Sequence, residues 1–148
     1  MSKQVQKTIK KKNNNNIWLI LGGLVIIALA VIIGFSQNTA DTNTLPLEVS
    51  VEDAYQMRDN GAFVLDVREL GEWEEGHIPD ATLIPLGQLE RRMNEIPKDQ
   101  EVVIVCRSGN RSAQARDILK NAGFTNITSM DGGMNQWIAK SYEVEIGQ

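Results

Sequence analysis

The only cysteine of this chain lies in the segment best suited to chemistry. Cys106 follows a short apolar run, and a polar, glycine-containing segment follows it as far as Ser112. The members of that segment are Arg107, Ser108, Gly109, Asn110, Arg111 and Ser112. Its backbone N–H groups and the start of a following helix can curl around an anion, and two arginines add positive charge. These surroundings favour a thiolate, so we expect Cys106 to have a lowered pKa and raised reactivity.

The elements on either side of Cys106 must place it at one edge of a sheet. Residues 101–105 (EVVIV) form a continuous apolar run, which is typical of a buried parallel strand. A helix is expected over residues 112–122, because apolar side chains recur there at helical spacing. In open parallel sheets ligands bind at the carboxyl ends of the strands. The position of Cys106 between strand and helix therefore predicts a binding site there.

Strand and helix patterns alternate through the rest of the domain. Pro85 indicates that its strand ends there or lies at a sheet edge, and Ser50 has the character of a helix N-cap. Further strands are expected at residues 62–67, 81–86 and 126–130. Further helices are expected at residues 51–60, 69–75, 87–96 and 133–140. This alternation indicates an α/β fold built from parallel β-α units.

Four motifs resemble those of single-domain rhodaneses, the thiosulfate sulfurtransferase family. They are LDVRE at 65–69, GHIPDA at 76–81, CRSGNRS at 106–112 and GGMNQW at 132–137. Their order and spacing make the resemblance specific, and it extends over residues 47–146. The resemblance implies a rhodanese-like fold, with a mainly parallel five-stranded sheet flanked by helices.

The resemblance also implies a reaction at Cys106. The thiolate would attack the outer sulfur of thiosulfate or a related small anionic donor and become a persulfide. A thiophilic acceptor, either a thiol or a sulfur carrier, would then take that sulfur. Backbone N–H groups of residues 107–112 would hold the anionic sulfur, and Arg111 is the side chain expected to contact an oxyanion. No cofactor is implied.

Three further residues are expected to support the site. Asp66 and Arg68 match a strand-end pair of the family, and we interpret them as a structural ion pair. His77 matches a position that the family uses for packing and hydrogen bonding, since a thiolate of low pKa needs no general base. A metal site is not expected, because one cysteine and one histidine supply too few ligands.

Two alternative functions stay open. Arg111 stands five positions after Cys106, and the resemblance associates this shorter loop with sulfur. Relatives that act on phosphate or arsenate use a loop one residue longer, so a phosphatase or an arsenate reductase is disfavoured. A non-catalytic sulfur-binding or regulatory rhodanese module is the other alternative, although silent domains commonly lack the cysteine.

The N-terminal part predicts attachment to a membrane. Residues 17–35 carry no charge and as a helix would span about 28 Å, close to the hydrocarbon thickness of a bilayer. Residues 1–16 hold five lysines and no acid, which predicts a cytoplasmic tail. Residues 36–46 are a polar linker, and residues 47–148 would form a domain on the outer, extracytoplasmic side. A cleaved signal peptide is the alternative, disfavoured by the long apolar run.

Charge argues against one class of partner. The chain has 15 basic and 19 acidic residues, and five of the basic ones precede residue 17. The rest therefore carries ten basic against 19 acidic residues. Nucleic-acid phosphates need a basic face, so nucleic acid is not expected as a partner.

Overall fold

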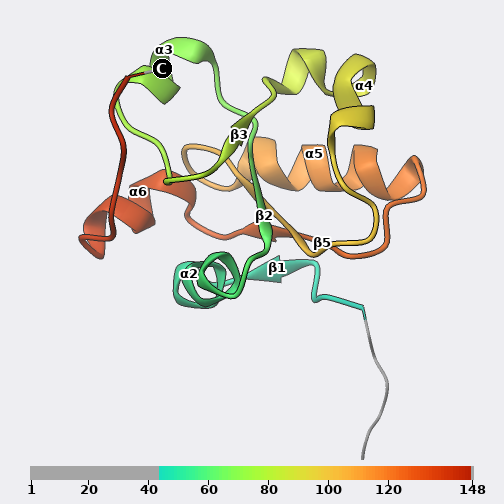
Figure 1. Ribbon diagram of the computed structural model, residues 1–148, viewed down its shortest axis with the longest axis horizontal. Coiled ribbons are helices and arrows are strands. Elements are labelled where there is room, and N and C mark those ends of the chain that lie inside the picture. The colour runs from blue at the N-terminus through green and yellow to red at the C-terminus, as the bar shows by residue number, and fades with distance from the viewer. Residues whose placement is uncertain (1–43, 148) are drawn as a thin grey trace, which may run out of the picture. The chain divides into compact units, whose positions relative to one another are not determined.

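A computed structural model describes residues 44–147, which contain a five-stranded sheet (Figure 1). Every strand pair is parallel, and the strand order is β1-β5-β4-β2-β3. The strands are β1 (Glu48–Val49), β2 (Phe63–Asp66), β3 (Thr82–Leu83), β4 (Val102–Val105) and β5 (Ile127–Met130). The predicted parallel five-stranded sheet is confirmed, with the strand before Pro85 at one edge. The two-residue strand β1 was not predicted from the sequence pattern.

Helices follow the strands in the predicted alternation. They are α2 (Val51–Asp59), α3 (Leu70–Glu74), α4 (Leu89–Arg92), α5 (Asn110–Asn121) and α6 (Gly133–Ala139). Ser50 caps α2 as expected, because its Oγ accepts a hydrogen bond of 3.1 Å from the Asp53 N–H. The helix expected over 87–96 is instead the short α4 between two 3-10 turns. Helix α5 begins two residues before the expected start, so the polar segment after Cys106 already includes its first turn.

The central strand β4 separates two apolar cores. Val102 and Ile104 pack with residues of α4 and α5, whereas Val103 and Val105 pack with residues of α2 and α6. Figure 1 shows α4 and α5 on one side of the sheet and α2 on the other. Side chains alternate between the faces of a strand. Cys106 continues this alternation and belongs to the core beneath α5.

Parallel pairing brings two chain segments to the same sheet edge. In the register of β2 with β4, Asp66 lies opposite Val105. The residues after both strands therefore leave the sheet side by side, one segment leading to α3 and the other to α5. This juxtaposition builds the site described next.

The predicted membrane span, residues 17–35, lies outside the described residues. Within residues 44–147 no helix combines the length and apolar character that crossing a bilayer requires.

Candidate active site

Cys106 lies at the carboxyl end of β4 with its side chain almost enclosed. The residue is 1% exposed. The Gly109 N–H donates a hydrogen bond to Sγ at 3.2 Å, and Sγ lies 3.6 Å from the Ser112 hydroxyl oxygen. In this structure the Ser112 hydroxyl accepts from the thiol and donates its own proton to the Gly109 carbonyl at 2.8 Å. A hydroxyl has one rotatable proton, so it must turn to Sγ to stabilise the thiolate. The sulfur therefore sits inside the turn that joins β4 to α5.

Two opposing effects act on the pKa of the Cys106 thiol. Burial disfavours the thiolate and by itself raises the pKa. Hydrogen bonds from the Ser112 side chain and from the backbone N–H groups of Ser112, Ser108 and Gly109 favour the thiolate. These bonds outweigh burial, so the pKa is lowered. The lowered pKa predicted from the sequence is thereby confirmed.

The backbone around Cys106 forms a cradle of N–H groups. Gly109 precedes α5 with φ of 101°, a left-handed conformation that glycine adopts without steric cost. The first N–H groups of a helix have no acceptor within the helix. Those of Asn110, Arg111 and Ser112 are therefore available to an anion beside Sγ.

The start of α6 fixes this cradle from the other side. The Met134 N–H donates to the Cys106 carbonyl at 2.8 Å, and the Asn135 N–H donates to the Arg107 carbonyl at 3.0 Å. Gly133 makes this approach possible, because a Cβ there would overlap the Cys106 carbonyl oxygen. The sequence showed the double glycine as a motif, but not that it holds the loop.

Asp66 and Arg68 form the expected ion pair below the loop. Arg68 Nη2 lies 2.6 Å from Asp66 Oδ2, and both side chains are buried. Arg68 also donates to the carbonyls of Glu72 at 3.0 Å and Gly76 at 2.9 Å. The pair thus ties the end of β2 to the middle of α3 and to the residue Gly76 that follows the helix.

Arg111 is engaged by a carboxylate that was not identified from the sequence. Its two Nη atoms each lie 2.7 Å from an oxygen of Glu72. Hydrogen bonding to Arg111 is the main reason that the pKa of Glu72 falls to about 2, and it also raises the pKa of Arg111. The two partners are 39 residues apart, so only the adjacency of β2 and β4 brings them together.

His77 takes a packing position away from the sulfur. Its ring stacks on Trp73 with centroids 3.6 Å apart, and Nδ1 lies 3.1 Å from the Trp73 carbonyl oxygen. Its backbone pairs with that of Glu145 in both directions. These contacts match the supporting role expected of His77 and join the C-terminal segment to α3.

A groove of about 210 Å³ opens beside the cradle. Arg107, exposed at its rim, is the only residue of the 107–112 segment that lines it. The lining residues are Arg68, Glu72, Glu75, Gly76, Arg107, Met134, Asn135 and Ile138. The groove therefore borders the loop that carries Cys106 at Arg107.

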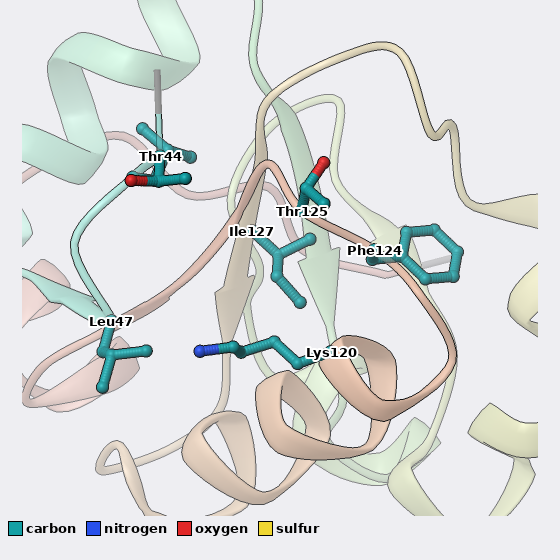
Figure 2. A pocket seen from close by; sticks show the side chains of 7 residues that line it. Thr44, Leu47, Lys120, Phe124, Thr125 and Ile127 are labelled. Carbon is teal, nitrogen blue, oxygen red and sulfur yellow. The ribbon is translucent and has the colours of Figure 1, made fainter. Parts of the chain in front are cut away.

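A second groove, of about 290 Å³, lies at the far end of α5 from Cys106. Figure 2 shows the Lys120 side chain extending across it toward Leu47, with Phe124 and Ile127 among the other lining side chains. It shares no lining residue with the groove beside Cys106.

Among the described residues, no group of three or more His, Cys, Asp and Glu side chains could hold a metal ion.

Several known proteins are similar to this chain in sequence and in fold. Residues 50–140 match the family described as the rhodanese-like domain. The putative sulfur carrier protein YrkF of Bacillus subtilis is 36% identical over 111 residues, which cover 73% of this chain and 59% of YrkF. The uncharacterized Bacillus subtilis protein YqhL is 35% identical over 127 residues, covering 86% of this chain and 95% of YqhL. The thiosulfate sulfurtransferase GlpE of Pseudomonas syringae is 35% identical over 86 residues, covering 58% of this chain and 81% of GlpE.

A solved structure agrees with these sequence matches. The rhodanese-related protein from Thermoplasma volcanium superimposes with a TM-score of 0.64 at 32% identity. The match covers 68% of this chain and 99% of that protein. The chain therefore spans nearly the whole of this structure and of YqhL, but about three fifths of the length of YrkF.

Proposed function

The chain belongs to the rhodanese-like domain family, and on that premise we propose that it transfers sulfane sulfur through a persulfide on Cys106. The observation that carries the proposal is the hydrogen-bonded, pKa-lowered thiol inside the cradle that joins β4 to α5. The relative GlpE, which is named as a thiosulfate sulfurtransferase, supports the same class of reaction.

In the first step the Cys106 thiolate attacks the outer sulfur of a donor such as thiosulfate. The bond from Sγ to that sulfur forms, the sulfur–sulfur bond of the donor breaks, and sulfite leaves with the electron pair. The product is a persulfide anion on Cys106. The N–H groups of Gly109 and of the first turn of α5 surround the place where this charge resides.

In the second step a nucleophilic acceptor attacks the outer sulfur of the persulfide. The new bond forms between acceptor and sulfur, and Cys106 leaves as the thiolate that began the cycle. The lowered pKa of Cys106 makes it a good leaving group as well as an available nucleophile. The acceptor we propose is a thiol or a sulfur-carrier protein.

The test is sulfur transfer by the full-length protein. With thiosulfate as donor and cyanide as acceptor we expect thiocyanate, and intact mass should show one added sulfur atom before cyanide is supplied. Cys106→Ser should abolish both signals. Thiocyanate formation by Cys106→Ser, or a protein that gains no sulfur from either thiosulfate or a persulfide donor, would contradict the proposal. Turnover of an aryl phosphate that depends on Cys106 would favour a phosphatase instead.

We also propose, from the sequence alone, that residues 17–35 anchor the chain in a membrane. The five lysines of residues 1–16 support a cytoplasmic N-terminus. The sulfur chemistry would then take place on the extracytoplasmic side.

A further inference from the structure

The ion pair between Glu72 and Arg111 bears on the choice of donor. We infer that Glu72 is a specificity-determining residue that occupies Arg111 and thereby disfavours donors with a dianionic leaving group, such as thiosulfate. The site is better matched to persulfide donors, whose leaving group is a thiolate. This inference rests on the proposed sulfur transfer and names its preferred substrate class.

The geometry balances the charge of Arg111 and uses two of its five N–H donors. Both of its Nη atoms bond Glu72 at 2.7 Å, which is the bidentate arrangement that orients a guanidinium most firmly. The two side chains are 30% and 27% exposed, so water screens the pair only in part. A thiosulfate oxygen would meet a guanidinium that Glu72 already orients and whose charge Glu72 already balances.

Glu72 is itself held in place from two directions. Its carboxylate accepts a hydrogen bond of 3.2 Å from the Glu69 N–H, and its carbonyl accepts one of 3.0 Å from Arg68. Arg111 keeps the carboxyl ionised at any pH near neutrality, since the pKa of Glu72 is about 2. The carboxylate is therefore a fixed, permanent negative charge next to the site.

The other cations near Cys106 do not replace Arg111. Arg68 is buried against Asp66, which balances its charge. Arg107 is exposed and lines the groove, but Glu75 lines the same groove. Arg68 and Arg111 are thus each paired with a carboxylate, and Arg107 lines the groove together with Glu75.

The two donor classes differ in the charge that develops as the bond breaks. Attack on thiosulfate expels sulfite, whose three oxygens carry two negative charges and need nearby cations in the transition state. Attack on a persulfide, R–S–S⁻, transfers its outer sulfur to Cys106 and expels the thiolate R–S⁻. That leaving group carries a single negative charge on sulfur. Hydrogen bonds from the N–H groups of the cradle can stabilise such a charge without a nearby cation.

The experiment compares Glu72→Gln with Glu75→Gln in the full-length protein. Both variants remove one negative charge from the same groove, but only the first releases Arg111. Glutamine keeps an acceptor for the Glu69 N–H, which limits damage to α3. The readout is kcat/KM for thiosulfate divided by kcat/KM for the persulfide of N-acetylcysteamine. This ratio does not depend on the fraction of active protein.

We expect Glu72→Gln to raise the ratio roughly tenfold, the size of a charge-assisted interaction regained by an oxyanion. Glu75→Gln should change the ratio less than about twofold, as an exposed, screened charge does. Equal rises in both variants would mean that net charge alone acts, and would overturn the inference. An unchanged or lower ratio in Glu72→Gln would also overturn it. If the wild type loads Cys106 from neither donor, the proposed function itself fails, and the inference falls with it.

Discussion

Hydrogen bonds to the sulfur lower the pKa of the Cys106 thiol. The donors are the Ser112 side chain and backbone N–H groups of the loop, as the causes of the lowered pKa show. His77 stacks on Trp73 and directs Nδ1 to a backbone carbonyl, so it is engaged elsewhere. A lowered pKa increases the fraction of thiolate at a given pH, and a thiolate needs no proton acceptor before it attacks. The site is thus ready for a donor without a catalytic histidine.

Replacing Ser112 by alanine should raise the pKa of the Cys106 thiol. The substitution removes the side-chain hydrogen bond that favours the thiolate, while burial continues to disfavour it. Because only the thiolate reacts, alkylation of Cys106 by iodoacetamide should slow severalfold below neutral pH, and the rate profile should move to higher pH. The chain has one cysteine, so the alkylated mass reports this residue alone.

Ser108→Ala is the matched control for this prediction. Ser108 contributes its backbone N–H to the thiolate and its residue is exposed, so the substitution should leave the rate profile in place. A shift of equal size in both variants would show that the Ser112 hydroxyl has no special part in stabilising the thiolate.

For single residues, the sequence predicts those contacts that join groups close together in the chain. The loop after Cys106 and the pair Asp66 and Arg68 are contiguous or nearly so, and their chemistry follows from their spacing. The pair of Glu72 with Arg111 depends on the pairing of β2 with β4 and could not be read from the spacing. From the sequence alone, Arg111 is therefore predicted to be an unpaired cation that can bind an oxyanion.

Among the elements, α6 has the closest bearing on the geometry of the loop. Its first turn donates two hydrogen bonds to the loop carbonyls, which leaves the loop N–H groups facing the sulfur. Gly133 lies at the point of contact with φ of 55°. A Cβ there would overlap the Cys106 carbonyl oxygen and come within 2.7 Å of backbone atoms of Arg107 and Ser108. These are backbone atoms, so no side-chain rotation relieves the clash.

Gly133→Ala should therefore both destabilise the domain and slow the chemistry. We expect a loss of about 2–4 kcal/mol in the free energy of unfolding, from overpacking plus a left-handed non-glycine residue. Urea unfolding measures this loss. In the fraction that stays folded, the loop should be displaced, so alkylation of Cys106 and sulfur transfer should each fall more than about tenfold.

Gly123→Ala separates backbone strain from the clash. Gly123 has φ of 90°, and a Cβ at this position would have no other atom within 4 Å, so alanine there meets strain alone. It should cost about 1–2 kcal/mol and leave the reactivity of Cys106 unchanged. If both variants lose stability equally and keep full reactivity, then the contact of α6 with the loop does not position the cradle.

The predicted helices and strands agree with the structure where the apolar run is long. They differ where a short segment is defined by its contacts with distant parts of the chain. The run at 101–105 marks β4, whose side chains are buried on both faces. β1 is two residues long, and its pairing with β5 leaves no pattern in the sequence. Between residues 87 and 96, Leu89 and Ile96 are buried as their helical spacing predicts. The backbone there nevertheless forms two 3-10 turns around α4, which the apolar spacing alone does not distinguish from one continuous helix.

For the whole molecule, the charge asymmetry of the chain suggests a topology. Five lysines precede the apolar segment 17–35, while the remainder is acidic. Lysines near the end of a spanning helix favour the cytoplasmic side. Cys106 is a poor reporter of the location of the domain, because it is 1% exposed. A cysteine on an exposed helix face is a better one.

Gln56→Cys in a Cys106→Ser background provides that reporter. Gln56 is an exposed residue of α2, on the side of the sheet away from α5. If the topology is as we propose, a membrane-impermeant maleimide should label this cysteine in intact cells that express the full-length protein. A cysteine at Gln4, within the lysine-rich tail, should be labelled only after the cells are permeabilised. Labelling of Gln56→Cys only after permeabilisation would contradict the topology. Labelling of both positions in intact cells would mean that residues 17–35 do not separate them across the membrane.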